Sequence, residues 1–215
     1  MDEKRLKILE AAMGEFTEKG YQAASTNKIC EKAGVSKGLI FHYFGSKEKL
    51  YIAAVSYAVD FATNEVRLEG EHWGDFVEMA IWSTKMKLDF NRKFPAVFGL
   101  IMQAYGNPPV ELKGKLDGFF DKAIERSEVQ MNQVLSEMKL KKDVNMDAAR
   151  KVMAALFKHI TEISTVYLQS HPNATMEEFV PLANDFTEMM RIVEFGICEE
   201  KKEFGRVSPN PFFNQ

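Results

Sequence analysis

The chain has 215 residues, of which 46% are hydrophobic and 27% are charged, a composition typical of folded globular proteins. No run of about 18 or more uncharged apolar residues occurs, so we expect no membrane-spanning segment and no membrane partner. The first residues lead directly into an amphipathic pattern rather than an apolar leader, which predicts a cytoplasmic protein. Its two cysteines, Cys30 and Cys198, lie far apart, so we expect neither a disulfide framework nor a structural metal site.

The net charge of −3 is unevenly distributed along the chain. Residues 1–50 carry nine Lys and Arg against seven Asp and Glu, a net charge of +2. The remainder carries nineteen against twenty-four, a net charge of −5. A mildly basic head on an acidic body fits a nucleic-acid-binding module joined to a domain of another kind, although so small an excess is also common on ordinary solvated surfaces.

Helical periodicity runs through nearly the whole chain, and no segment shows sustained strand-like alternation. The first expected helix, 3–19, stops at Gly20, and a short second helix lies between Ser25 and Gly34. Proline, glycine and asparagine clusters separate the others. These expected helices span 37–44, 47–67, 73–92, 94–105, 109–139, 147–170 and 176–202, and the tail 204–215 has no regular structure.

The segment 25–44 carries the clearest chemical signal. Two short capped helices flank a turn at Gly34, and their apolar residues are spaced to share a small core, which predicts a helix-turn-helix. In such a motif the second helix, here 37–44, presents its N-terminal residues and outward face to the DNA major groove. Lys37 supplies charge, Gly38 permits close approach, and His42 and Tyr43 offer donors. The helix N-termini at Thr26, Ser36 and Ser46 suit phosphate oxygens. Tyr43 also fits a half-buried core position.

The N-terminal segment, roughly residues 4–62, resembles the DNA-binding domain of the TetR (tetracycline repressor) family. The resemblance rests on motifs in the right order: Ile8-Leu9-x-Ala11-Ala12, Phe16-x-x-Lys19-Gly20-Tyr21, Ile29 with Ala33-Gly34-Val35-Ser36-Lys37-Gly38, and Tyr43-Phe44-x-Ser46-Lys47-Glu48-Lys49-Leu50. It implies an all-α fold of about nine helices. The implied domains are a DNA-binding head at 1–46, a ligand-binding and dimerisation domain at 47–203, and the tail.

The same resemblance implies a role for individual residues. Positions matching Thr26, Lys37, Tyr43 and Lys47 meet phosphates in this family, and those matching Gly38, Leu39 and His42 approach base edges. Leu39 departs from the family pattern, which favours a small hydroxyl residue. Leucine cannot hydrogen-bond a base, but it can pack on a thymine methyl group.

The last two expected helices carry wide apolar faces, which close either an intramolecular core or a dimer interface. The family resemblance favours a homodimer that places two heads on a pseudo-palindromic, double-stranded operator. The interface candidates are Leu156, His159, Ile160, Ile163, Phe186, Met190 and Val193.

The middle helices are rich in aromatic residues and methionine, which form either ordinary core or the wall of a cavity for an apolar effector. The candidates for this pocket are Trp82, Met86, Phe90, Phe98, Met102, Phe119 and Phe120. We recognise no nucleophile elbow, glycine-rich phosphate loop or metal-ligand cluster, and therefore expect neither an enzyme nor a cofactor. The sequence thus predicts a ligand-responsive transcriptional repressor, the alternative being a helical interaction protein that keeps the fold without binding specific DNA.

Overall fold

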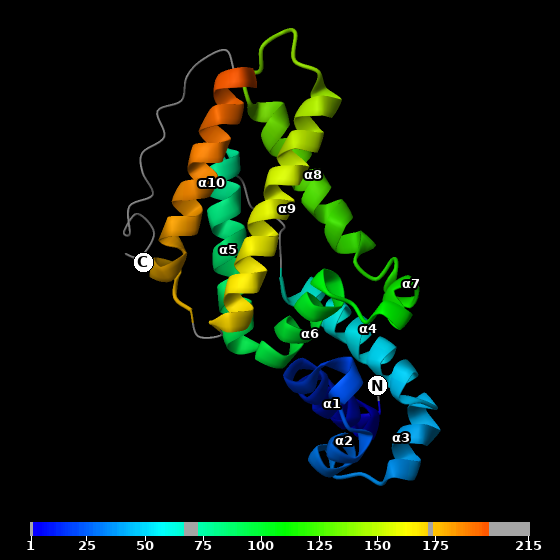
Figure 1. Cartoon of the computed structure of the whole chain (residues 1–215). Coiled ribbons are helices and arrows are strands. Elements are labelled where there is room, and N and C mark those ends of the chain that lie inside the picture. Colours follow the sequence, from blue (N-terminus) through cyan, green and yellow to red (C-terminus); the bar gives the residue numbers. More distant parts are fainter. Residues whose placement is uncertain (1, 67–72, 172–173, 198–215) are drawn as a thin grey trace. The chain divides into compact units, whose positions relative to one another are not determined.

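The computed structural model describes residues 2–66, 73–171 and 174–197 (Figure 1). Over these residues the chain is all-α, with ten α-helices, one 3-10 turn and no β-strand, which confirms the predicted fold class. The helices are α1 (Glu3–Ala23), α2 (Thr26–Ala33), α3 (Lys37–Phe44), α4 (Lys47–Glu65), α5 (Phe76–Lys93), α6 (Pro95–Gly106), the 3-10 turn η1 (Val110–Leu112), α7 (Lys113–Leu116), α8 (Asp121–Glu137), α9 (Met146–Ser170) and α10 (Met176–Ile197).

The expected single helix at 109–139 is the one substantial difference. The chain instead forms η1 and α7, turns after Leu116, and begins α8 at Asp121. Gly118 has a φ of 84°. A right-handed helix cannot continue through a residue in this conformation, which glycine adopts without strain. Apolar residues recur at helical spacing on both sides of this glycine, so the sequence pattern alone does not show the break between the two helices.

The helices form two compact units. One unit contains Met1–Arg67 and Lys93–Ala123, and the other contains Leu68–Arg92 and Ile124–Gln215. The head therefore shares its unit with α4, α6 and α7. The expected tail, 204–215, lies outside the described residues, and none of the described helices is long and apolar enough to cross a membrane.

Helix α1 is the centre of the first unit. Asp2 begins it by accepting a hydrogen bond of 3.2 Å from the Lys4 N–H, and Gly20, with a φ of 70°, interrupts it as the sequence predicted. Its buried face packs against α2, α4 and α6. The buried hydrophobic residues of that face are Ile8, Leu9, Ala12, Met13 and Phe16.

The contact of α1 with α6 is close and directional. The Thr17 hydroxyl donates a 2.8 Å hydrogen bond to the Ala96 carbonyl, and the Gln103 side-chain amide donates one of 2.8 Å to the Thr17 carbonyl. Gly99 lies between these two bonds, where a Cβ would overlap the Thr17 methyl group. Because the glycine permits this approach, the head helix α1 and α6 are held as one body.

The second unit surrounds its own hydrophobic core, to which α5, α8, α9 and α10 all contribute (Figure 1). Asn145 begins α9 by accepting a 3.0 Å hydrogen bond from the Ala148 N–H. The Glu178 carboxylate accepts a 2.6 Å hydrogen bond from the Thr175 N–H at the start of α10. Helix α10 begins at Met176 and continues through Pro181.

Candidate nucleic-acid interface

Helices α2 and α3 are joined by the tight turn that a helix-turn-helix requires. Gly34 adopts the left-handed conformation with a φ of 63°, and the Val35 N–H donates a 3.0 Å hydrogen bond to the Cys30 carbonyl. Ile29 of α2 and Ile40 and Phe44 of α3 are buried, so the two helices share a core with α1 and α4. The predicted motif at 25–44 therefore has the expected local geometry.

Helix α3 directs a distinct set of residues away from that core. The Ser36 hydroxyl caps its N-terminus by accepting a 3.3 Å hydrogen bond from the Leu39 N–H. Because Ile40 and Phe44 face inward, Gly38 and His42 occupy the centre of the opposite face, and both are exposed. Leu39 flanks this face and is half-buried. An N-terminus with free N–H groups and an exposed glycine suits close approach to a nucleic-acid backbone.

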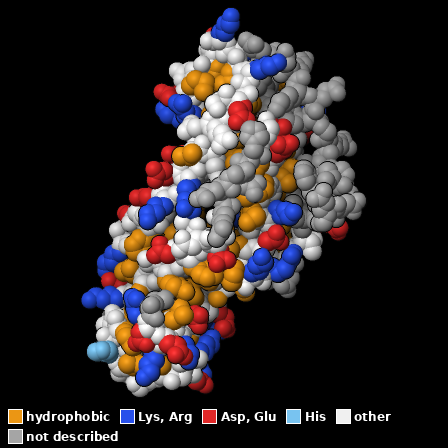
Figure 2. Space-filling model, turned by 180° about the vertical axis from the view of Figure 1, so that it is seen from behind, with side chains coloured by type: hydrophobic (Ala, Val, Ile, Leu, Met, Phe, Trp, Pro, Cys, Tyr) orange, Lys and Arg blue, Asp and Glu red, His pale blue; other side chains and the backbone are white. Residues whose placement is uncertain are grey.

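Lys37 is the cation most freely available on this helix. Its side chain is exposed and forms no ion pair with any described residue. On α2, in contrast, Lys28 pairs with Glu31 at 2.9 Å and Lys32 pairs with Glu15 at 3.1 Å. Figure 2 shows the same intermixing of positive and negative side chains across the face it displays. Positive charge on α2 and on this face is therefore largely offset by nearby carboxylates.

Tyr43, predicted to contact phosphate, has its hydroxyl engaged within the protein. The hydroxyl donates a hydrogen bond to the carboxylate of Asp2, the N-cap of α1. That bond lowers the pKa of Asp2, to which the Lys4 N–H also donates, and raises the pKa of Tyr43. The ring is half-buried, which fits the alternative that Tyr43 is a half-buried core residue, and its contact with phosphate stays a prediction.

Lys47, the other predicted phosphate contact, is likewise engaged. Its ammonium group donates a 2.9 Å hydrogen bond to the Gln22 carbonyl and lies 5.1 Å from the centre of the Tyr21 ring. Burial lowers the pKa of this lysine. Tyr21 in turn meets Tyr51 of α4 edge-on at 5.0 Å, and burial raises the pKa of Tyr51 to about 12. Lys47 therefore joins the beginning of α4 to the end of α1.

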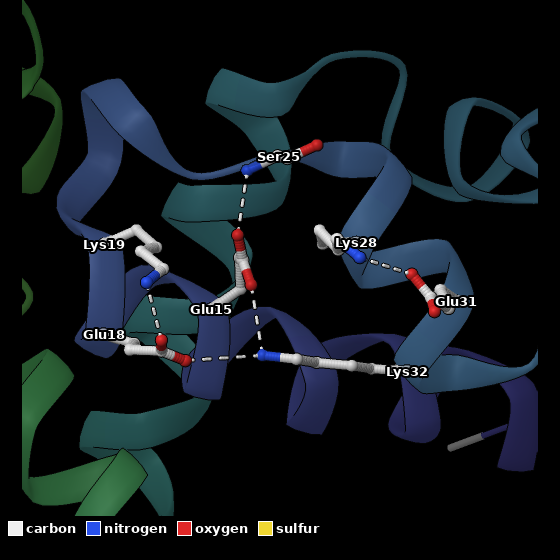
Figure 3. Close-up of polar contacts among 7 residues, drawn as sticks. All are labelled: Glu15, Glu18, Lys19, Ser25, Lys28, Glu31 and Lys32. Carbon is white, nitrogen blue, oxygen red and sulfur yellow. Dashed lines mark hydrogen bonds and ion pairs between the residues drawn. The ribbon is translucent and has the colours of Figure 1, made fainter.

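A buried carboxylate fixes the beginning of α2, and the sequence reading missed it. Glu15 is only 4% exposed; its two oxygens accept hydrogen bonds from the Ser25 N–H at 3.2 Å and the Lys32 ammonium at 3.1 Å (Figure 3). Burial by itself raises the pKa of Glu15, but these two bonds outweigh it and the pKa is lowered. Ser25, the N-cap residue of α2, makes no side-chain cap bond, and Glu15 instead holds the N–H of Ser25 itself. Thr26, the first residue of α2, is half-buried beside this site.

Phe41 was also missed as a surface residue. It lies on α3 beside the exposed face and is 41% exposed, which is unusual for a phenylalanine. In the sequence it stands in an apolar run, Leu39-Ile40-Phe41, that gives no sign of which member faces outward. Only the helical register fixed by Ile40 and Phe44 reveals it. Phe41 and Leu39 therefore flank Gly38 and His42 with apolar groups.

The predicted effector-pocket residues divide between the two units. Trp82, Met86 and Phe90 belong to the second unit, whereas Phe98, Met102, Phe119 and Phe120 belong to the first. A small cavity between α5, α9 and α10 of the second unit is lined by none of the seven. Two of them pack as ordinary aromatic pairs, Trp82 with Trp73 and Phe120 with Tyr105.

The predicted interface residues on α9 and α10 divide between core and surface. Phe186 and Met190 are fully buried in the hydrophobic core of the second unit, so these two offer no surface to a second protomer. Leu156, Ile160 and Val193 pack against the same core and are half-buried. His159 is exposed and Ile163 is half-buried. The apolar pattern predicted from the sequence is thus mainly the core face. The exposed large hydrophobic residues of these helices lie outside the predicted set and are Met146, Val152 and Val166 on α9, and Ile192 and Phe195 on α10.

The comparison with known proteins places this geometry in a family. Residues 8–54 match the model for bacterial regulatory proteins of the tetR family. The chain is 41% identical over 66 residues to the HTH-type transcriptional activator FasR of Mycolicibacterium smegmatis, covering 31% of this chain and 30% of FasR. It is 32% identical over 124 residues to the HTH-type transcriptional regulator RutR of Escherichia coli, covering 55% of this chain and 57% of RutR. These matches thus span between about a third and somewhat more than half of each relative.

The likeness in fold extends further along the chain. The crystal structure of the Bacillus subtilis transcriptional regulator FadR in complex with stearoyl-CoA aligns with a TM-score of 0.59 at 16% identity. That alignment covers 86% of this chain and 96% of FadR. The helix-turn-helix geometry, the family match over residues 8–54 and this shared fold agree with one another. Residues 8–54 therefore form a DNA-binding domain of the tetR family type, and the chain as a whole shares its fold with solved regulators of this kind.

Proposed function

We propose that the protein is a sequence-specific DNA-binding transcriptional regulator that acts as a repressor in the cytoplasm. The observation that carries this proposal is the capped helix α3, whose exposed face is formed by Gly38 and His42 and flanked by Leu39 and Phe41. Such a helix fits the major groove, with its N-terminal residues at the base edges. Repression follows where the operator overlaps a promoter.

The residues of the head have two kinds of role in this proposal. Lys37, Ser36 and the N-terminus of α2 at Thr26 contact phosphates and set the register on the duplex. Tyr43 and Lys47 join them when DNA displaces their present partners, Asp2 and the Gln22 carbonyl. The outward residues of α3 read base edges, and the apolar pair Leu39 and Phe41 selects thymine methyl groups, the one apolar feature of the major groove.

The regulator acts as a homodimer on a pseudo-palindromic operator. On α9, Val152, His159, Ile163 and Val166 follow one another at helical spacing along one stripe. Val166 is 66% exposed, and Ile192 on α10 is 74% exposed. Exposed aliphatic residues at this spacing favour a helix-to-helix contact between two copies, which places two α3 helices on successive half-sites.

A small-molecule effector bound in the second unit modulates operator affinity. The structural neighbour FadR was crystallised with stearoyl-CoA, which shows that this fold accommodates a ligand with a long apolar chain. In the present protein α4 belongs to the same unit as the head and packs against α1 and α6. A displacement of α4 or α6 caused by the effector therefore also moves the head. To change operator affinity, the effector must bind the DNA-binding conformation and the non-binding conformation with different affinities.

The experiment that tests the proposal is a fluorescence-anisotropy titration with DNA from the upstream region of the protein's own gene, at several salt concentrations. Scrambled DNA is the control. A preference of about a thousandfold or more, at two protomers or a multiple per site, supports a specific regulator. In vitro selection from a random pool finds the operator if it lies elsewhere. Weak, sequence-blind binding to every pool contradicts the proposal and favours a protein-interaction role.

A further inference from the structure

A cavity of about 30 Å³ lies between α5, α9 and α10 of the second unit. Its wall is almost entirely apolar, with Ala80 of α5, Ile160 of α9 and Phe179 and Phe186 of α10 among the lining residues. Two hydroxyl groups interrupt it, Thr84 and Ser164. Ser164 is only 1% exposed and brings a polar group to an otherwise apolar wall.

A lysine lies one helical turn along α5 from the lining residue Thr84. Lys87 follows Thr84 by three residues on α5, so the two share one face of the helix. Its ammonium group donates a 3.1 Å hydrogen bond to the hydroxyl of Thr161, which adjoins the lining residue Ile160 on α9. Lys87 forms no ion pair with any residue in the described part of the chain. Lys87 is half-buried, and this burial lowers its pKa to about 8, so its ammonium group loses part of its hydration without gaining a negative partner.

The combination of an apolar cavity and an uncompensated cation defines the chemistry of a ligand. An isolated buried ammonium is unfavourable, whereas a buried ammonium that meets an anion is stabilised by a charge-assisted hydrogen bond. A neutral apolar ligand would fill the cavity and leave this charge unpaired. A small inorganic anion would pair with the charge and leave the apolar wall uncovered.

We propose that the effector is an amphiphilic anion, whose apolar chain occupies the cavity between α5, α9 and α10 and whose carboxylate or phosphate binds Lys87 and Thr161. This inference rests on the proposed function, because it names the chemical class of the effector in that proposal. The cavity as it stands has room for about one water-sized group, so the chain of the ligand must separate the side chains around it. That requirement couples binding to a change in the packing of α5 against α9 and α10, which is what an effector needs.

The test compares ligands that share one apolar chain and differ only in the head group. Binding of dodecanoate, dodecyl phosphate, dodecan-1-ol and dodecylamine to the full-length protein is measured by isothermal titration calorimetry, below the concentration at which any of them forms micelles. We expect at least one of the two anions to bind about tenfold to a hundredfold more tightly than the alcohol. This difference in affinity corresponds to the contribution of a hydrogen bond to a charged group. The amine should bind least well.

Three variants assign that preference to Lys87. Lys87→Met keeps the length and packing of the side chain but removes the charge, so the anions and the alcohol should bind equally. Lys87→Arg keeps the charge and should keep the preference. Lys85→Met is the matched control, because Lys85 is an exposed lysine on the same helix, and it should leave every affinity unchanged. If the role of Lys87 is purely structural, the Lys87→Met variant should change in thermal stability but keep the head-group preference of the wild type.

The proposal is overturned if the alcohol binds as tightly as the anions, if the amine binds best, if neither anion binds saturably, or if Lys87→Met retains the preference. Operator binding is measured separately on the ligand-free protein in the same buffer. If the anions bind through Lys87 while the protein shows no DNA specificity, the proposed function fails and the ligand site stands. If DNA binding is specific and the anions do not bind, the reverse holds.

Discussion

The hydroxyl of Tyr43 on α3 donates a hydrogen bond to the carboxylate of Asp2, the residue that caps α1. This carboxylate lies beside the proposed phosphate-binding surface. It keeps the Tyr43 hydroxyl from donating to a phosphate, and its negative charge repels DNA. We therefore expect Asp2→Ala to tighten operator binding a few-fold and to steepen its salt dependence, because Tyr43 is released and one negative charge is removed. Glu3→Ala removes an equal charge without releasing Tyr43. If both variants change affinity equally, the hydrogen bond has no part in the effect.

Lys37 and Lys47 are expected to differ in how they contribute to DNA binding. Lys37 is exposed and forms no ion pair among the described residues, so Lys37→Ala should reduce the slope of log affinity against log salt by about one unit without changing stability. Lys47 holds the Gln22 carbonyl at 2.9 Å. Lys47→Ala should therefore cost about 1 kcal/mol of unfolding free energy as well as affinity. Urea unfolding and anisotropy at several salt concentrations measure both quantities; a Lys47→Ala variant of unchanged stability contradicts this role.

The local structure of the head could be predicted from the sequence because its signals are short-range. Gly20, Gly34 and the caps at Ser36 and Ser46 determine where helices end and begin using only neighbouring residues, and all of them have the predicted effect. Glu15 could not be predicted in the same way. Its partners, Ser25 and Lys32, are ten and seventeen residues away, and only the packing of α1 against α2 brings them together.

The second unit was less predictable for a related reason. An apolar stripe in a sequence shows that a helix face is covered, but it does not show by what. Phe186 and Met190 were assigned to an interface between protomers, and they are covered instead by helices of the same unit. Lys87 gave no signal at all, because a lysine in an amphipathic helix is normally on the solvated face.

Glu15 should make the stability of the protein depend on pH in the acidic range. Its pKa in the folded protein lies below the ordinary value of 4.5, so its contribution is fully present above about pH 4.5 and is lost as the pH falls through the folded pKa. Glu15→Gln should cost about 1–3 kcal/mol at neutral pH and flatten this acid dependence. Glu18→Gln is the control, since Glu18 is exposed. Urea unfolding from pH 3 to 7 measures the effect; parallel curves for Glu15→Gln and wild type would contradict it.

Leu39 and Phe41 should make the operator sensitive to thymine methyl groups. Once the operator is known, thymine is replaced by uracil at single positions of one half-site, which removes only the C5-methyl group. We expect one or two positions at which this costs about 0.8 kcal/mol, the value of burying one such group. Leu39→Ala or Phe41→Ala should abolish the cost at one position each. His42→Ala should lower affinity by about 1–3 kcal/mol and leave the uracil cost unchanged. Equal binding of thymine and uracil operators would disprove thymine-methyl recognition.

Val166 on α9 and Ile192 on α10 should determine whether two protomers associate. Both are strongly exposed aliphatic residues, and we expect Val166→Glu or Ile192→Glu to place a charge in the dimer interface that has no partner and is costly to desolvate. Sedimentation velocity should show dimers for the wild type and monomers for each variant. The monomeric variants should keep their helical content but lose most operator affinity, because one head alone contacts only one half-site.

The control for this prediction is Val129→Glu. Val129 is an exposed valine on α8, outside the proposed interface, and is 62% exposed. Its replacement adds the same charge at a similarly exposed position, so it should leave both the dimer and operator affinity intact. A protein that stays dimeric in Val166→Glu and Ile192→Glu associates through another surface. A wild type that is monomeric at concentrations where it binds DNA tightly would mean that the two heads meet only on the operator, and that these side chains contribute to cooperativity rather than to a stable dimer.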